Sequence, residues 1–130
     1  MARKSSDQPT ELELRILRIL WDDSPLPVRE VRQRLADSGR DLAHTTVITT
    51  LNVMVDKGQL KRKKDGKAFL FSPKIAREKT SREMLGRLVD RVFDGSASAV
   101  MASLFDHNDP DTEELVELRR LLNKKLKEKR

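Results

Sequence analysis

The chain has 130 residues, of which 37 % are hydrophobic and 37 % are charged. This length and apolar content suit one domain, or one small domain with an appendage. The absence of cysteine excludes disulfides, thiolate metal sites and a cysteine nucleophile. No apolar run approaches the roughly 18 residues of a membrane span, and the N-terminus lacks the apolar core of a signal peptide. We therefore expect a cytoplasmic protein without membrane insertion.

The formal net charge of +6 is unevenly distributed along the chain. Residues 1–74 carry 15 basic against 10 acidic side chains, whereas residues 75–130 carry 12 against 11. Residues 57–67 alone hold six basic side chains and one acidic side chain. A localised basic patch of this kind is typical of proteins that bind nucleic acids.

Two helices are expected in the first part of the chain, after a flexible tail over residues 1–9. Thr10 and Glu13 have the spacing of a capping box, and apolar residues then recur at helical spacing as far as Trp21. The stretch DDSPLPVRE breaks this helix. Apolar residues at i, i+3 and i+7 over residues 28–35 predict a short second helix, and DSGRD predicts a turn after it.

A third helix is predicted from about Ala43 to Asp56, and Gly58 is the residue expected to end it. One side is apolar, and the opposite side is rich in threonine, although β-branched threonine is a poor helix former. An ordinary exposed face is one interpretation. The other is a recognition helix, because short hydroxyl and methyl side chains can enter the major groove of DNA. The candidate contacts are His44, Thr45, Thr46, Thr49 and Thr50.

The stretch LKRKKDGKAFLF, residues 60–71, predicts a β-hairpin with a cationic tip. Asp65-Gly66 is expected to form a two-residue type I′ turn, which would place Lys64 opposite Lys67. Like charges on opposite strands are unfavourable, and such local conflicts tend to mark functional surfaces. Alternatively, the lysines only protect an exposed sheet edge from aggregation. The candidate anion-binding residues are Arg62, Lys63, Lys64 and Lys67.

The order of these elements is typical of a winged helix-turn-helix, in which the third helix enters the major groove and the hairpin contacts flanking DNA. The predicted fold is mainly α with one small β-hairpin. Residues 10–73 form an N-terminal winged helix-turn-helix domain, and residues 74–130 form a C-terminal helical dimerisation region.

The dimerisation region is inferred from three amphipathic helical patterns that are too short to bury their apolar stripes alone. Asp111 is the expected N-cap of the last helix. A symmetric dimer would cover the stripes. The expected dimerisation residues are Leu85, Leu88, Val92, Leu104, Leu115, Leu118 and Leu122.

An enzyme is the main alternative from another class of protein. Its candidate catalysts, His44 and His107, occur without a cysteine, a glycine-rich phosphate loop or a metal-ligand spacing. We therefore expect no catalytic residue, no cofactor and no metal site. Two further alternatives stay open, because a winged helix can also serve as a protein-interaction module or bind nucleic acid without sequence preference.

Three segments resemble the BlaI/MecI family of bacterial repressors, the penicillinase-repressor family: ELELRILRILWDDSPLPVREV, LAHTTVITTLNVMVDKGQLKRKKDGKAFLFSP and EELVELRRLL. The resemblance covers roughly residues 10–122. It implies a homodimer that binds a partly palindromic operator on double-stranded DNA. It further implies repression of genes for antibiotic resistance or other stress responses. A membrane sensor protease, whose signal leads to cleavage of the repressor, is the additional partner that the resemblance implies.

The sequence departs from the family pattern at three places. Family members released by proteolysis are cut at an Asn-Phe pair, and an ungapped alignment places Ser103-Leu104 at that position. Copper-responsive relatives bind the metal through cysteine pairs, which this chain lacks. Pro27 stands where relatives usually carry a Ser or Thr N-cap on the second helix, and such a cap contributes about 1 kcal/mol.

Overall fold

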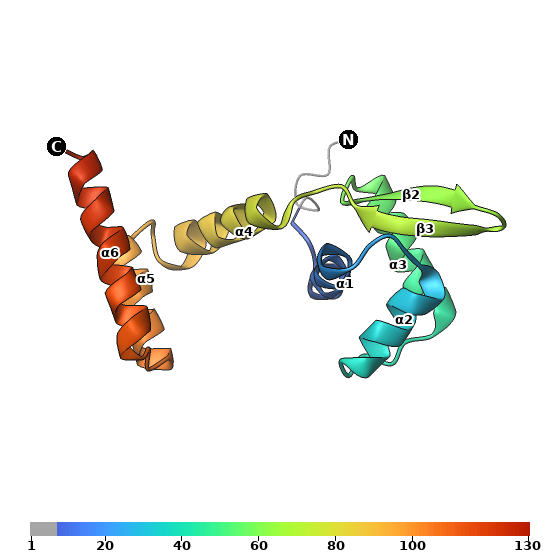
Figure 1. Ribbon diagram of the computed structural model, residues 1–130, viewed down its shortest axis with the longest axis horizontal. Helices are drawn as coiled ribbons and strands as arrows, with labels where there is room; N and C mark the ends of the chain where they lie inside the picture. The colour runs from blue at the N-terminus through green and yellow to red at the C-terminus, as the bar shows by residue number, and fades with distance from the viewer. Residues whose placement is uncertain (1–7) are drawn as a thin grey trace. The chain divides into compact units, whose positions relative to one another are not determined.

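The computed structural model describes residues 8–130, and this part of the chain is mainly helical, with six α-helices and a small three-stranded sheet (Figure 1). In chain order the elements are α1 (Glu11–Asp22), β1 (Leu26–Pro27), α2 (Val28–Asp37), α3 (His44–Asp56), β2 (Leu60–Asp65), β3 (Ala68–Pro73), α4 (Arg77–Val92), α5 (Ala97–His107) and α6 (Thr112–Glu128). The predicted order of three helices, a hairpin and three further helices is confirmed. The chain divides into an N-terminal unit that ends at Met84 and a C-terminal unit over Leu85–Arg130. Residues 1–7 of the expected flexible tail lie outside the described residues.

The N-terminal unit is organised around one apolar core. Helix α1 begins with the predicted capping box, in which Thr10 Oγ1 accepts from the Glu13 N–H at 3.2 Å and the Glu13 carboxylate accepts from the Thr10 N–H at 3.1 Å. Each of the first three helices and each strand contributes at least one side chain to the core. The buried apolar residues are Ile16, Leu17, Leu20, Leu26, Val31, Leu35, Val47, Leu51, Met54, Leu60 and Phe71. This shared core holds α3 and the hairpin in fixed positions on α1 and α2.

The beginning of α4 is fixed to the end of α1. Trp21 Nε1 donates to the carbonyl oxygen of Ile75 at 2.9 Å. The Arg77 guanidinium lies over the Trp21 ring, 5.5 Å from its centroid, and also pairs with Asp22 at 3.1 Å. These contacts order the chain between β3 and α4 within the N-terminal unit.

Helix α3 ends at the predicted glycine. The N–H of Gly58 donates to Val55 O at 3.0 Å and that of Gln59 donates to Met54 O at 2.9 Å, which are the two hydrogen bonds of a Schellman motif. Gly58 has a φ of +82°, a conformation that glycine adopts without steric cost. The chain therefore turns directly from α3 into β2.

The hairpin belongs to a three-stranded antiparallel sheet of order β1-β3-β2. Strand β1, which was not predicted, pairs with β3 by placing Leu26 opposite Phe71 and Pro27 opposite Leu70. Proline is tolerated here because β1 is an edge strand. The third strand therefore attaches the base of the hairpin to the segment that leads into α2.

The hairpin register differs from the expected register by two residues. The loop is Gly66-Lys67, and Lys64 lies opposite Phe69 rather than opposite Lys67. Gly66 has a φ of +63° and Asp65 has no positive φ, so the predicted type I′ turn is wrong. Glycine at the first central position is instead typical of a type II′ turn. The observed register avoids the like-charge pair, and because the shift is even each side chain keeps its face of the sheet.

The C-terminal unit contains amphipathic helices but no buried core. Helix α5 begins at Ser96, whose hydroxyl accepts from the Ala99 N–H at 3.1 Å. Asp111 is confirmed as the cap of α6, because its carboxylate accepts from the Glu114 N–H at 2.9 Å. No side chain of α5 or α6 is buried, and the buried residue of α4, Thr80, belongs to the N-terminal unit.

Candidate nucleic-acid interface

Helices α2 and α3 form a helix-turn-helix. Pro27 occupies the N-cap of α2 and makes no side-chain capping hydrogen bond. Arg32 Nε donates to the carbonyl oxygen of Leu42 at 2.7 Å, which fastens the turn before α3 to α2. Val31 of α2 and Val47 of α3 are both buried in the core. Burial of one side of α3 leaves its opposite side facing solvent.

The solvent-facing side of α3 carries the predicted threonines. Thr45, Thr46 and Thr49 are exposed, as is His44 at the first helical position. Within residues 8–130, the hydroxyls of these three threonines have no hydrogen-bond partner, so they are free to bind a ligand. Thr50 is half-buried, and its hydroxyl donates to the Thr46 carbonyl at 2.8 Å. The Thr50 hydroxyl therefore already bonds to its own helix.

Val53 extends the same face and was not among the predicted contacts. It lies one turn beyond Thr49, and 41 % of its surface is exposed. The i, i+4 spacing from Thr49 is the sequence signal that identifies this position. Its methyl groups are suited to apolar contact with a thymine methyl in a major groove.

The tip of the β2–β3 hairpin carries cations without acidic partners. Lys63, Lys64 and Lys67 are exposed, and none of them forms an ion pair with another described residue. The hairpin projects beyond the helices of the N-terminal unit (Figure 1). We refer to residues 60–73 as the wing. Unpaired ammonium groups on a projecting ribbon can bind phosphate groups without first breaking an internal ion pair.

Arg62, the fourth predicted wing cation, has partners within the protein. Its Nη1 donates to Asn52 Oδ1 on α3, and its guanidinium lies over the Phe69 ring, 4.9 Å from the centroid. A groove of about 470 Å³ lies between α3 and the wing at this point, and His44 and Lys67 are also part of its lining. Arg62 thus connects two elements that both border the groove.

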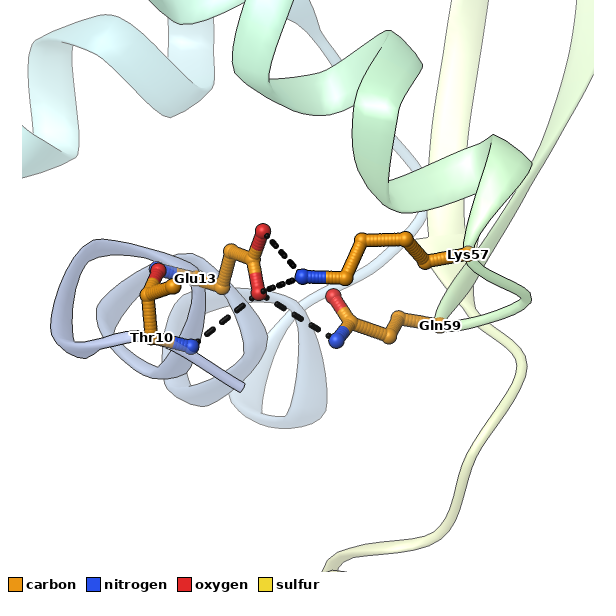
Figure 2. Close-up of polar contacts among 4 residues, drawn as sticks. All are labelled: Thr10, Glu13, Lys57 and Gln59. Atoms are coloured by element: carbon orange, nitrogen blue, oxygen red, sulfur yellow. Dashed lines mark hydrogen bonds and ion pairs between the residues drawn. The ribbon is translucent and has the colours of Figure 1, made fainter. Parts of the chain in front are cut away.

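Lys57, the first cation of the basic run, points to Glu13 on α1 (Figure 2). Its Nζ lies 2.9 and 3.0 Å from the two Glu13 carboxylate oxygens, and Gln59 Nε2 donates to the same carboxylate at 3.3 Å. The Lys57 and Glu13 side chains are 12 % and 6 % exposed. Lys57 therefore adds nothing to the exposed basic surface.

Burial and hydrogen bonding act in opposite directions on Glu13. Burial raises the pKa of its carboxyl group, whereas hydrogen bonds from Lys57, Thr10 and Gln59 and the Lys57 charge lower it. The lowering effects are larger together, so the pKa lies below its ordinary value of 4.5. The Glu13 carboxylate is therefore held in its charged form as the acceptor of this network.

No metal or membrane site is found in the described part of the chain. Residues 8–130 contain no group of three or more acidic or histidine side chains arranged to hold a metal ion. His44 belongs to α3, and His107 is exposed at the end of α5. Among the same residues, every helix is too short or too polar to cross a bilayer.

The predicted dimerisation residues all lie on helices of the C-terminal unit, and all but the half-buried Leu118 are exposed. Four further apolar side chains are exposed there and were not included in the prediction: Phe105, Val116, Leu121 and Leu126. Of the large hydrophobic side chains that are exposed in residues 8–130, all except Val53 and Phe69 belong to this unit. The exposed apolar surface is therefore concentrated on α4, α5 and α6.

The Ser103-Leu104 pair lies within α5. Ser103 is half-buried and Leu104 is exposed. A protease that binds its substrate in an extended conformation would have to unwind α5 locally before it could cut this peptide bond.

A helix-turn-helix with an outward-facing third helix and a β-hairpin wing defines a winged-helix protein. A model of the penicillinase repressor family matches residues 9–124, and the chain belongs to this family, as its sequence motifs indicate. It is 23 % identical over 119 residues to the penicillinase repressor of Bacillus licheniformis, and the match covers 92 % of each chain. It is also 23 % identical to the methicillin resistance regulatory protein MecI of Mammaliicoccus sciuri, over 87 % of this chain and 91 % of the relative. A solution structure of the DNA-binding domain of the repressor BlaI superposes with a TM-score of 0.49 at 27 % identity, and the match covers 55 % of this chain and 85 % of that domain.

Proposed function

We propose that this protein is a transcriptional repressor that binds a partly palindromic operator on double-stranded DNA as a homodimer. The observation that carries the proposal is the juxtaposition of free threonine hydroxyls on α3 with unpaired lysines on the wing. Membership of the penicillinase repressor family supports it. A protein-interaction module would have no need for so many cations at one tip.

In this proposal α3 reads the major groove. Thr45, Thr46 and Thr49 contact base edges or phosphates, with His44 and Thr50 at the margin of the same face. Lys63, Lys64 and Lys67 bind the phosphates of the flanking DNA, and Arg62 lies at the base of that surface. The two groups have different roles, because base contacts provide specificity whereas phosphate contacts provide affinity and orientation.

The homodimer is supported by the C-terminal unit, whose helices expose apolar side chains and bury none in α5 or α6. A second copy supplies an equivalent apolar surface, and two-fold symmetry lets the same residues meet on both sides. Two winged helices related by such an axis would read two half-sites of a palindrome. Leu85, Leu88, Val92, Leu104, Leu115, Leu118 and Leu122 would line the contact.

The regulated genes and the route of release extend the proposal further. The relatives are named for penicillinase and methicillin resistance, which favours antibiotic-resistance or stress genes as targets. A membrane sensor protease is the proposed partner for induction. Cleavage at Ser103-Leu104 would cut α5 and separate α6 from the rest of the chain, thereby disrupting the dimerisation surface.

The test is selection of the full-length protein on a random duplex library, followed by titrations of selected and random duplexes at several salt concentrations. We expect a two-fold symmetric site that is bound far more tightly than random DNA. Binding that is equally tight on all duplexes would contradict the repressor assignment and indicate a non-specific nucleic-acid binder. No binding even at low salt would favour a protein-interaction module.

A further inference from the structure

Arg62 differs from the other cations of the wing because its guanidinium is held by two separate elements. It lies on β2 and reaches Asn52 on α3 through Nη1, while its planar face covers the Phe69 ring on β3. Phe69 is the diagonal neighbour of Arg62, whose directly opposite residue is the buried Phe71. The guanidinium therefore links the wing to the recognition helix at the edge of the groove between them.

The geometry uses features that only arginine has. One edge of the guanidinium donates to an amide oxygen while its face stacks on an aromatic ring. A lysine at this position would keep the charge but could not do both at once. Lys64, two residues further along the same face of β2, has no partner among the described residues and extends towards the tip.

We propose that Arg62 is a positioning residue, which holds the wing at a fixed angle to α3 through Asn52 and Phe69, rather than an independent phosphate contact. The inference rests on the proposed DNA-binding function. With the angle fixed, phosphates bound at Lys63, Lys64 and Lys67 also set how α3 enters the major groove. Without the link, the wing still binds phosphate, but it no longer orients α3.

The experiment compares Arg62→Lys, Arg62→Ala, Asn52→Ala and the double variant Arg62→Ala/Asn52→Ala with Lys64→Ala as the phosphate-contact control. Each full-length variant is titrated with the duplex recovered by selection and with a random duplex of equal length, over a range of salt. Thermal unfolding by circular dichroism checks that each variant is folded, and the exposure of Arg62 favours a small change in midpoint.

A positioning role predicts that Arg62→Lys and Asn52→Ala each weaken binding of the selected duplex about three- to tenfold, on the scale of one charge-assisted hydrogen bond. Binding of random DNA and the salt slope should stay close to those of the unmodified protein. The double variant should lose no more than Arg62→Ala alone, because both changes break the same link. Lys64→Ala should instead weaken both duplexes and lower the salt slope by about 0.9.

A second readout does not need the operator. In the free protein, nitrogen-15 relaxation of the amides at residues 63–68 should show increased mobility in both Arg62→Lys and Asn52→Ala, but not in Lys64→Ala. The proposal is overturned if Arg62→Lys binds like the unmodified protein, or if Arg62→Ala lowers the salt slope by about one while Asn52→Ala has no effect. If the unmodified protein shows no sequence preference at all, the repressor function itself fails, which is a separate outcome.

Discussion

Lys57 Nζ donates to both carboxylate oxygens of Glu13 and so ties the end of α3 to the first turn of α1 (Figure 2). The same carboxylate accepts from the Thr10 N–H and from Gln59 Nε2. One buried side chain therefore caps α1 and at the same time fixes the point where α3 passes into β2. The position of the recognition helix depends on this pair as well as on the apolar core.

Replacement of Lys57 by methionine should destabilise the N-terminal unit, because Glu13 would be left buried without its cation. We expect the free energy of unfolding in urea to fall by about 3 kcal/mol. Lys61→Met is the matched control, since Lys61 is exposed, and it should change stability by less than about 0.5 kcal/mol. Glu13→Gln combined with Lys57→Met should recover part of the loss, because no unpaired charge remains. Equal stability of Lys57→Met and Lys61→Met would show that the pair is unimportant.

The lowered pKa of Glu13 predicts a dependence of stability on pH. Its folded pKa lies below the ordinary value of 4.5, so the folded state favours the deprotonated form. This contribution is fully present above pH 4.5 and is lost as the pH falls through the lower folded value. The difference in unfolding free energy between the unmodified protein and Glu13→Gln should therefore be constant near pH 7 and shrink in acid. A difference that is unchanged down to pH 2 would contradict the assignment.

Thr49→Ala should reduce sequence preference rather than general affinity. Its hydroxyl is exposed on α3, and loss of a base contact there would cost about 1–3 kcal/mol on the selected duplex and almost nothing on random DNA. Thr50→Ala is the control from the same helix, because the Thr50 hydroxyl already donates to Thr46 O. Equal losses on both duplexes for Thr49→Ala would remove Thr49 from the base-reading set.

The wing lysines should act additively through salt. Replacement of Lys63, Lys64 and Lys67 together by alanine should lower the log–log slope of affinity against salt by about 2.7, at roughly 0.9 per phosphate contact. Lys127→Ala near the end of α6 should leave the slope unchanged, although it removes the same charge. A slope that fails to change in the triple variant would mean that the wing does not contact phosphates.

Local signals in the sequence identify the helix boundaries well, and they fail where distant residues meet. Thr10 with Glu13, Gly58 and Asp111 mark helix ends through bonds to near neighbours, and all are confirmed. The turn at Asp65-Gly66 was misassigned because the motif ignores the strand pairing, which places Lys64 against an aromatic ring.

Two other features of the N-terminal unit carry almost no local signal. Strand β1 has only two residues, one of them proline, so it produces no detectable alternation. Glu13 and Lys57 are 44 residues apart, and Asn52 meets Arg62 only because α3 turns back through Gly58 into β2. The exposed threonines could be placed on one face from helical spacing, whereas the internal partners of two cations in the basic run could not.

Leu122→Asp should convert the dimer into a monomer and thereby separate the two half-sites. Leu122 lies on α6 with 57 % of its surface exposed, and a carboxylate there would be desolvated without a partner in an apolar contact. Sedimentation velocity should show a monomer. Affinity for the full palindrome should fall towards that for a single half-site, because the two winged helices then bind independently. Asn123→Asp introduces the same charge at the adjacent exposed position and should stay dimeric with unchanged operator affinity. A Leu122→Asp protein that sediments as a dimer would place the interface elsewhere on the C-terminal unit.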